Sequence, residues 1–371
     1  MVPTVLQVLP ALNAGGVERG TLEIAAAVVQ AGGRALVASA GGRLVPELEA
    51  LGARHVTLPL DRKLAIWRNG AALAQLVGGE GVAIIHARSR APAWSAWRAA
   101  RLSGAHFVTT WHGTYNENLP GKRHYNAVMA RGERVIAISR FIAAHIAARH
   151  PDAAIRLIPR GVDPVLFDPD AVAPARVAAQ RTAWGIAGGS AGGPDQPVVL
   201  LPARLTRWKG QAVLIEALGR VPDPPLAVLL GDGRPAYAAE LRQLAAAHGV
   251  RLVLPGHTAD MPAALAAADL VVHASTDAEA FGRVVIEAQA MRRPVIATDL
   301  GGPRETIRHG ETGWLTPPGD VAALAARIAA VLAMPAEARF ALGTAARAAV
   351  LTGFTTRAMQ AATLDVYREL A

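Results

Sequence analysis

Short apolar segments alternate with helical segments along most of this 371-residue chain, and this alternation constrains the fold more than any other feature. At the spacing found in the first half, such alternation predicts parallel β-α-β units. The predicted strands there cover residues 4–9, 35–39, 83–86, 106–110 and 134–139, and the predicted helices cover 17–31, 94–102 and 140–149.

The second half repeats the pattern, so the sequence predicts an α/β fold with two Rossmann-like, doubly wound domains. Residues 161–174, rich in Pro and Asp, and the Gly-rich residues 188–197 interrupt the pattern. A boundary near residues 165–175 gives domains over 1–168 and 169–354. The second set of strands covers 198–201, 227–230, 251–254, 270–273 and 295–297, and its helices cover 209–219, 236–248, 261–267 and 283–291.

The composition argues against several classes of protein. No apolar run reaches the roughly 18–20 residues of a membrane span, and the N-terminus lacks the basic start of a signal peptide. The chain has no cysteine, which excludes disulfides and thiolate metal sites. We therefore expect a cytoplasmic protein.

The positive charge lies entirely in the first half. Residues 1–165 hold 19 Lys and Arg against 10 Asp and Glu, a net charge of +9, whereas residues 166–371 hold 19 of each. One interpretation is an Arg-rich codon bias. The other is a surface that meets an anionic partner such as the inner leaflet of a membrane or a phosphorylated lipid. We expect no nucleic acid partner, because neither an aromatic-interleaved basic stripe nor a recognition-helix pattern is evident.

Residues 276–319 carry the densest chemistry. Glu279 and Glu287 lie eight positions apart. Gly282 lies between them, directly before a predicted helix that contains Glu287. Helix N-termini that begin at a glycine bind phosphate through free backbone N–H groups and the helix dipole. A carboxylate one turn inside the helix can reach a ribose hydroxyl, and one in the preceding loop can reach another polyol. Together these features describe a site for a nucleotide-sugar.

This segment resembles the Glu-x7-Glu signature of the retaining family 4 glycosyltransferases, which have the GT-B fold. The resemblance implies two Rossmann-like domains that face across a cleft, with an acceptor-side first domain and a nucleotide-sugar-binding second domain. It also implies that a last helix, residues 355–371, crosses back onto the first domain. Further matches follow the family's order along the chain at Gly15-Gly16, 109–113, 137–140, 158–167, 203–210, 230–233 and 317–320.

The resemblance assigns roles in the second domain. Arg204 and Lys209, after a predicted strand, would neutralise the diphosphate, and Glu279 would contact hydroxyls of the donor sugar. Alternatives stay open: surface charge for the two basic residues, an exposed helix charge for Glu287, and a plain turn for Gly231–Gly233. The implied donor-binding residues are Gly15, Gly16, Gly231, Gly233, Gly256, Phe281, Gly282, Arg283, Val284 and Glu287.

In the first domain, His112 follows a predicted strand and would touch the donor sugar near the reacting carbon, with a purely structural histidine as the alternative. The implied catalytic set is therefore His112, Arg204, Lys209 and Glu279. No Asp-x-Asp motif lies at a strand end, and no cluster has metal-ligand spacing. We therefore expect no metal and no other cofactor, with the leaving diphosphate stabilised by basic residues and helix amides.

Residues 86–97 and 111–116 resemble lipopolysaccharide core sugar transferases, several of them mannosyltransferases. On that basis Arg88, Arg90, Tyr115 and Lys122 would bind an anionic glycolipid or saccharide acceptor. The polar, basic residues 115–131 are interpreted as an acceptor loop or a membrane-facing loop on the cytoplasmic face of the inner membrane. Ordinary surface charge is the alternative for the two arginines.

The sequence thus predicts a hexosyltransferase, with mannose from GDP-mannose as the first choice. A UDP-sugar enzyme of exopolysaccharide synthesis, a nucleotide-sugar epimerase and a non-catalytic nucleotide-sugar-binding protein are the alternatives. A phosphorylase requires a pyridoxal-phosphate lysine, and Lys209 is the one lysine in the second half. The intact set of Arg204, Lys209, Glu279 and Glu287 argues against a chain that has lost turnover.

Overall fold

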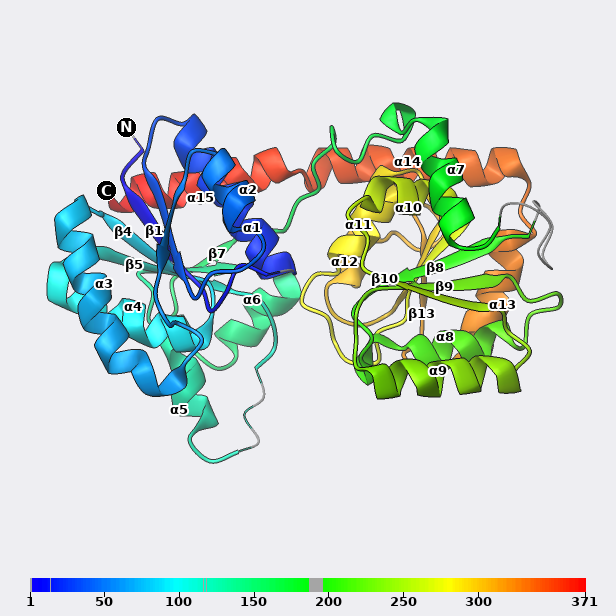
Figure 1. Ribbon diagram of the computed structural model, residues 1–371, viewed down its shortest axis with the longest axis horizontal. Helices are drawn as coiled ribbons and strands as arrows, with labels where there is room; N and C mark the ends of the chain where they lie inside the picture. The colour runs from blue at the N-terminus through cyan, green and yellow to red at the C-terminus, as the bar shows by residue number, and fades with distance from the viewer. Residues whose placement is uncertain (1, 14, 116, 118, 187–195) are drawn as a thin grey trace. The chain divides into compact units, whose positions relative to one another are not determined.

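The computed structural model describes residues 2–13, 15–115, 117, 119–186 and 196–371 (Figure 1). It divides into two compact units. The first unit comprises Met1–Arg160 and Thr356–Ala371, and the second comprises Gly161–Thr355. Most of the Gly-rich segment 188–197 lies outside the described residues.

The first unit is built on a seven-stranded sheet in the order β3-β2-β1-β4-β5-β6-β7, in which every neighbouring pair is parallel. The central strands are apolar and buried because helices cover both faces of a parallel sheet. The order reverses at β1, which pairs with both β2 and β4. The strands are β1 (Val5–Val8), β2 (Ala35–Ser39), β3 (Arg54–Thr57), β4 (Ile84–Ala87), β5 (His106–Trp111), β6 (Arg134–Ala137) and β7 (Ile155–Leu157).

Helices of the first unit pack in pairs. Helix α3 lies beside α4, and α1 lies beside α15, which comes from the end of the chain. Met359, Leu364 and Tyr367 of α15 belong to the same apolar core as Leu22 and Ile24 of α1. The helices are α1 (Gly16–Gln30), α2 (Val45–Ala50), α3 (Ile66–Glu80), α4 (Arg90–Ser103), α5 (Lys122–Ala127), α6 (Arg140–Ala147) and α15 (Thr356–Leu370).

The second unit has a six-stranded parallel sheet in the order β10-β9-β8-β11-β12-β13. Its order reverses at β8, which pairs with both β9 and β11. Helices α8 and α9 lie on one side of this sheet, and α10 and α11 lie on the other (Figure 1). The strands are β8 (Val198–Pro202), β9 (Leu226–Leu230), β10 (Leu252–Gly256), β11 (Leu270–His273), β12 (Val295–Thr298) and β13 (Trp314–Thr316).

The longest helix of the second unit, α14 (Ala336–Gly353), comes after its sheet. The helices are α7 (Pro174–Ala183), α8 (Gln211–Leu218), α9 (Pro235–Ala247), α10 (Met261–Ala267), α11 (Arg283–Ala290), α12 (Pro303–Thr306), α13 (Val321–Leu332) and α14 (Ala336–Gly353). No single described helix is long and apolar enough to cross a membrane, although α13 and α14, bent by 110°, meet the length and composition criteria as a pair.

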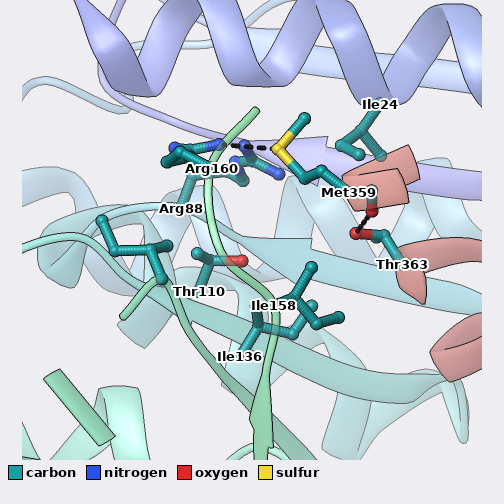
Figure 2. Close-up of a pocket in the computed structure, with 9 residues that line it drawn as sticks. Ile24, Arg88, Thr110, Ile136, Ile158, Arg160, Met359 and Thr363 are labelled. Atoms are coloured by element: carbon teal, nitrogen blue, oxygen red, sulfur yellow. Dashed lines mark hydrogen bonds between the residues drawn. The ribbon is translucent and has the colours of Figure 1, made fainter. Parts of the chain in front are cut away.

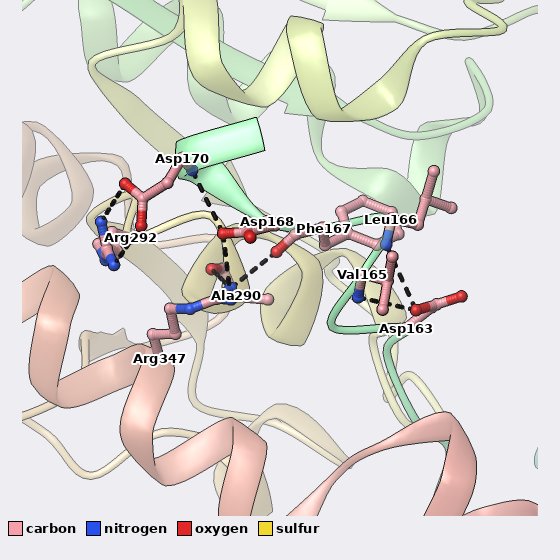
Figure 3. Close-up of polar contacts among 9 residues, drawn as sticks. All are labelled: Asp163, Val165, Leu166, Phe167, Asp168, Asp170, Ala290, Arg292 and Arg347. Atoms are coloured by element: carbon pink, nitrogen blue, oxygen red, sulfur yellow. Dashed lines mark hydrogen bonds and ion pairs between the residues drawn. The ribbon is translucent and has the colours of Figure 1, made fainter. Parts of the chain in front are cut away.

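The segment after β7 is held by the second unit. Arg347 of α14 donates through Nη1 to the carbonyl of Phe167 at 2.7 Å, and its Nη2 lies 3.3 Å from Asp168 Oδ1. Arg292 pairs with both oxygens of Asp170 at 2.8 Å (Figure 3). Residues 161–168 and 355 therefore belong to the second unit, whereas the sequence predicts them in the first.

Candidate active site

Glu279 is the centre of a polar cluster in the second unit. Its Oε2 lies 2.6 Å from Lys209 Nζ, 2.5 Å from His273 Nε2 and 3.3 Å from Ser275 Oγ. Lys209 follows β8, and His273 is the last residue of β11, so the cluster forms where the carboxyl ends of adjacent strands meet. None of these contacts uses Oε1, which leaves that oxygen for a ligand's hydroxyl groups.

The cluster keeps Glu279 ionised. Burial raises the pKa of this carboxyl, but His273 and Lys209 together lower it further, and the net result is a pKa well below the ordinary value. The side chains of Lys209 and Glu279 are 13% and 22% exposed. A carboxylate fixed in this way can accept hydrogen bonds from sugar hydroxyls without taking up a proton.

His273 is a member of the cluster that the sequence analysis missed. Its side chain is almost fully buried, and Nδ1 has no hydrogen-bond partner among the described residues. The available signal was a histidine at the end of an apolar strand six residues before Glu279, the same signal that singled out His112.

Helix α11 begins as the sequence predicts. Gly282 precedes it with φ of 82°, in the left-handed region that favours glycine. Arg283 Nε lies 3.5 Å from Glu287 Oε1, and the two side chains are 17% and 14% exposed. The alternative of an exposed helix charge for Glu287 is therefore wrong. Val284 follows in the first turn, and the donor contacts of these residues remain predictions.

The other predicted donor residues of the second unit differ in surroundings. Arg204 is exposed. Gly231 and Gly233 pack against the loop after β8: a Cβ on Gly231 would lie 2.3 Å from the Ala203 carbonyl, and one on Gly233 would lie 2.3 Å from Leu205 Cβ. The plain-turn interpretation accounts for both glycines.

Gly256 and Phe281, two further predicted donor residues, could contact a ligand only through the backbone. Gly256 has φ of 79°, and a Cβ there would have one neighbour within 4 Å, the Asp232 carboxylate. Phe281 is 2% exposed, and its ring packs edge-on against Phe354 with centroids 5.8 Å apart. The Phe281 side chain is therefore part of the core, and only its backbone is left for a ligand.

In the first unit, His112 follows β5, and Gly15 and Gly16 precede the body of α1. Arg160 donates through Nη2 to His112 Nδ1 at 2.8 Å and to the Gly16 carbonyl at 3.2 Å. His112 Nε2 is buried and has no hydrogen-bond partner in the described parts of the chain. Burial, followed by the charges of Arg160 and Arg88, holds the pKa of His112 well below its ordinary value.

Arg88 is 2% exposed, so the surface-charge interpretation is wrong for this residue. Its Nη1 donates to Gln7 Oε1 at 3.1 Å, whereas Nε and Nη2 find no hydrogen-bond partner within the described ranges. Together with Arg160, Thr110 and Met359 it lines a cavity of about 10 Å³ (Figure 2), enough for one water. Burial lowers the pKa of Arg88 to about 10.

Arg90 and Tyr115 contact each other. The Arg90 guanidinium lies 4.3 Å from the Tyr115 ring centroid, and Arg90 Nη1 donates to Asn126 Oδ1 at 3.0 Å. Tyr115 stacks on Trp111, and burial raises its pKa to about 12. Their acceptor role, like that of Arg88, stays a prediction.

The segment interpreted as a loop at 115–131 contains helical structure. Lys122 begins α5, which runs directly into a 3₁₀ turn (Val128–Ala130). Asn126, Val128 and Met129 are fully buried, because this segment packs over α4 and β5. The loop interpretation is wrong for residues 122–130.

The fold also forms a basic aromatic surface. We define it as the apolar and aromatic residues Leu64, Trp67, Trp94, Trp97 and Tyr125 together with the cations over the aromatic rings, which are Arg98, Arg101, Lys122 and Arg131. A groove of about 330 Å³ is lined by Leu64, Ile66, Trp67, Trp94 and Tyr125. The sequence-based statement that basic and aromatic residues are not interleaved is therefore wrong. The cation pairs are Arg98 with Trp67 at 4.8 Å, Arg131 with Trp97 at 4.5 Å and with Trp94 at 5.2 Å, Arg101 with Trp97 at 5.5 Å, and Lys122 with Tyr125 at 5.9 Å.

Two family models match the chain. The model described as Glycosyltransferase Family 4 matches residues 14–166, and the model described as Glycosyl transferases group 1 matches residues 190–349. A D-inositol 3-phosphate glycosyltransferase of Xylanimonas cellulosilytica is 31% identical over 315 residues, which cover 77% of this chain and 72% of that protein. This chain belongs to the family 4 glycosyltransferases. It is an enzyme that transfers glycosyl groups.

Other relatives match over shorter regions. A GDP-mannose-dependent alpha-(1-6)-phosphatidylinositol monomannoside mannosyltransferase of Mycolicibacterium smegmatis is 35% identical over 57% of this chain and 56% of its own length. The lipopolysaccharide core biosynthesis glycosyltransferase LpsE of Rhizobium meliloti is 37% identical over 38% of this chain and 40% of its own length. The chain thus spans about half of these two relatives or less.

Solved structures match the whole chain. A glycosyltransferase from Rickettsia africae superposes with a TM-score of 0.87 at 32% identity and covers 99% of this chain and 98% of its own. HepE of Anabaena, solved with UDP and glucose, has a TM-score of 0.87 at 25% identity over 100% of both chains. The fold is therefore GT-B, as the sequence predicts.

Proposed function

We propose that this glycosyltransferase moves a hexose from a nucleoside diphosphate sugar, with retention of configuration, to an anionic glycolipid or saccharide. The observation that carries the proposal is the fixed Glu279 carboxylate, held by Lys209 and His273 beside the start of α11. Mannose from GDP-mannose is the first choice, supported by the similarity to the GDP-mannose-dependent mannosyltransferase of Mycolicibacterium smegmatis. A UDP-sugar is the alternative, supported by the Anabaena structure.

The proposed reaction transfers the sugar from the diphosphate to an oxygen of the acceptor. The bond between the sugar's anomeric carbon and the diphosphate breaks while a bond to the acceptor oxygen forms on the same face, and the acceptor proton passes to the leaving phosphate. Arg204, Lys209 and the amides at the start of α11 stabilise the diphosphate. Glu279 holds the sugar through its hydroxyls. We propose that no metal takes part, and within the described residues no group of three His, Cys, Asp or Glu is placed to bind one.

The acceptor is proposed from charge. The first unit holds 21 Lys and Arg against 11 Asp and Glu, a net charge of +10. The two inositol-containing acceptors in the relatives' names are anionic, and a third relative acts in lipopolysaccharide core synthesis. A lipopolysaccharide core or other lipid-linked saccharide on the cytoplasmic face of the inner membrane fits this charge.

A nucleotide-sugar panel tests the donor. Purified protein is heated with GDP-mannose, UDP-glucose, UDP-galactose, UDP-N-acetylglucosamine or ADP-heptose in the presence of EDTA. A donor at 100 times its Kd adds about 2.7 kcal/mol to the free energy of unfolding, which raises the melting temperature measurably. Stabilisation by GDP-mannose supports the first choice, and loss of that shift in Glu279→Ala ties it to the cluster. No response to any donor, repeated with magnesium, contradicts the site.

We also propose that the basic aromatic surface meets an anionic membrane. Leu64 is fully exposed and Trp67 is 70% exposed, and the guanidinium of Arg98 lies over the Trp67 ring. Exposed Leu and Trp beside arginines match a lipid headgroup layer, because the rings enter the interface while the cations meet anionic lipids.

Vesicle sedimentation tests this surface. Replacing Leu64 and Trp67 together with Ser removes apolar area worth about 1.5–3 kcal/mol per side chain, so binding to phosphatidylglycerol vesicles is expected to fall at least tenfold. Phe340→Ser, at a position that is 63% exposed in the second unit, is the matched control and is expected to bind like the wild type. Equal binding by the double variant, or tight binding of single-stranded nucleic acid by the wild type, contradicts the membrane proposal.

A further inference from the structure

The contact between Arg160 and His112 determines which ring nitrogen of His112 carries the proton. Arg160 Nη2 lies 2.8 Å from His112 Nδ1. A guanidinium group only donates hydrogen bonds, so Nδ1 must supply its lone pair as the acceptor. The proton of a neutral His112 therefore sits on Nε2, and that nitrogen is a donor.

Arg160 is itself held in place. It is 4% exposed, and Nη2 also donates to the Gly16 carbonyl at 3.2 Å. Its Nη1 lies 3.8 Å from the Met359 sulfur of α15 (Figure 2). On α1, a Cβ at Gly20 would lie 2.1 Å from Nη1, so the helix passes the guanidinium only because residue 20 is glycine.

The surroundings of His112 oppose its protonation. Burial and the cationic neighbours lower its pKa, so the ring stays neutral in the ordinary range of pH. Its Nε2 is buried and meets no acceptor in the part of the chain that the structure describes. A buried donor without an acceptor costs free energy unless a ligand supplies one. The titratable or charged groups that act on or contact His112 are Arg160, Arg88, His86 and Tyr115.

We propose that Arg160 is a positioning residue that fixes His112 as the Nε2–H tautomer, so that His112 donates a hydrogen bond to an oxygen of the bound nucleotide-sugar. The first part of the proposal concerns the free enzyme alone. The second part rests on the proposed function, because it requires the donor sugar to reach His112.

Nitrogen NMR of histidine-labelled protein tests the tautomer without any substrate. The two ring nitrogens of neutral histidine differ in ¹⁵N shift according to which one is protonated, and His112→Gln identifies the signal by its loss. The wild type is expected to show a protonated Nε2 and an unprotonated Nδ1 for His112. Arg160→Met is expected to mix the tautomers, Arg160→Lys to restore the pure form, and Arg156→Met, a control on β7, to leave it unchanged. A protonated Nδ1 in the wild type would overturn the proposal.

Kinetics and pH dependence then test the consequence for catalysis. In metal sites, loss of the group that orients a ligating histidine costs about 10–100-fold in activity. By the same reasoning Arg160→Met is expected to lose about that much kcat/KM and Arg160→Lys to recover most of it. In Arg160→Met the pKa of His112 should rise toward its ordinary value, because one nearby cation is gone, and activity should then fall as pH drops below about 6.5. If the wild type has the Nε2–H tautomer, Arg160→Met mixes the tautomers and the kinetics of Arg160→Met are unchanged, the second part of the proposal is wrong and the first part holds. Absence of transfer by the wild type with any donor would instead contradict the proposed function.

Discussion

Glu279 is a carboxylate that its two cationic or donor neighbours hold in place. Lys209 and His273 reach it from the ends of neighbouring strands, and both place their nitrogen on the same oxygen, Oε2. This arrangement fixes the carboxylate plane and keeps it ionised, because both neighbours lower its pKa. Neither of these two contacts uses Oε1.

Replacing His273 tests that arrangement at the scale of one residue. In His273→Leu the carboxylate loses a donor, so the KM for the donor sugar is expected to rise about 10- to 150-fold, which corresponds to the ~1.5–3 kcal/mol of a charge-assisted hydrogen bond. His273→Gln keeps an N–H group near the same position and is the matched control. Steady-state kinetics over a range of donor concentrations measure both variants, and equal KM values for the Leu and Gln variants would remove His273 from the site.

Contacts between residues were predictable where the chemistry is local in sequence. Glu279, Gly282 and Glu287 lie in one segment, and Lys209 lies in the loop after β8, so the contact between Lys209 and Glu279 follows from the order of parallel strands. His273 was missed although its partner Glu279 is six residues away, whereas Arg160 was missed because its significance comes from a partner far away in the sequence. His112 lies 48 positions from Arg160 in the sequence, and no local sequence pattern predicts that these two side chains meet.

At the scale of elements, the loop between β8 and α8 packs on the residues after β11. Gly210 ends the 3₁₀ turn Arg207–Lys209 with φ of 72°, and a Cβ there would lie 1.8 Å from the Ala274 carbonyl. Lys209 is thereby brought to within reach of Glu279. The close approach of two backbones is what places the cation.

Gly210→Ala is expected to destabilise the protein by more than Gly319→Ala, which is matched in φ. Gly319 also has φ of 72°, but nothing lies within 4 Å of its Cβ position. Its substitution exposes the backbone cost alone, about 1–2 kcal/mol, whereas Gly210→Ala adds a clash with the backbone and should also reduce transfer. Urea unfolding measures the difference, and equal midpoints for the two variants would contradict the close packing of this loop.

Central strands were predictable and peripheral elements were not. The predicted strands that became β1, β2, β4, β5, β6, β8, β9, β10, β11 and β12 differ from the structure by a few residues at most. The missed strand β3 reads Arg-His-Val-Thr and is only partly buried, since it lies at the edge of its sheet. The long helix α14 was missed as well: its 18 residues include many alanines, which gave no clear apolar period.

At the scale of the whole molecule, buried neutral histidines make stability depend on pH. His86 and His112 have pKa values well below 6.5, mainly because of burial. As pH falls below 6.5, these residues take up protons in the unfolded chain and not in the folded one. Each therefore lowers the free energy of unfolding by up to about 1.4 kcal/mol per pH unit, and above pH 7 neither contributes a slope.

Urea unfolding at pH 7.5, 6.5 and 5.5 checks this expectation. The wild type should lose stability between pH 6.5 and 5.5, and His112→Gln should lose less, because one buried titrating group is gone. Loss of Glu279 ionisation acts in a different window, below pH 4.5, since the pKa of that carboxyl is lowered. Identical slopes for wild type and His112→Gln between pH 6.5 and 5.5 would show that His112 is protonated in the folded state.

The last helix has a consequence for how the protein is made. Helix α15 supplies Met359, Leu364 and Tyr367 to the core of the first unit, and the Tyr367 hydroxyl lies 2.6 Å from His86 Nδ1. A ribosome delivers α15 only after it has synthesised all of Gly161–Thr355. The second unit, which is continuous in sequence, therefore has all of its residues before the first does. During translation, part of the core of the first unit therefore stays exposed until α15 has been synthesised. A stalled or truncated chain would expose that surface to chaperones and proteases.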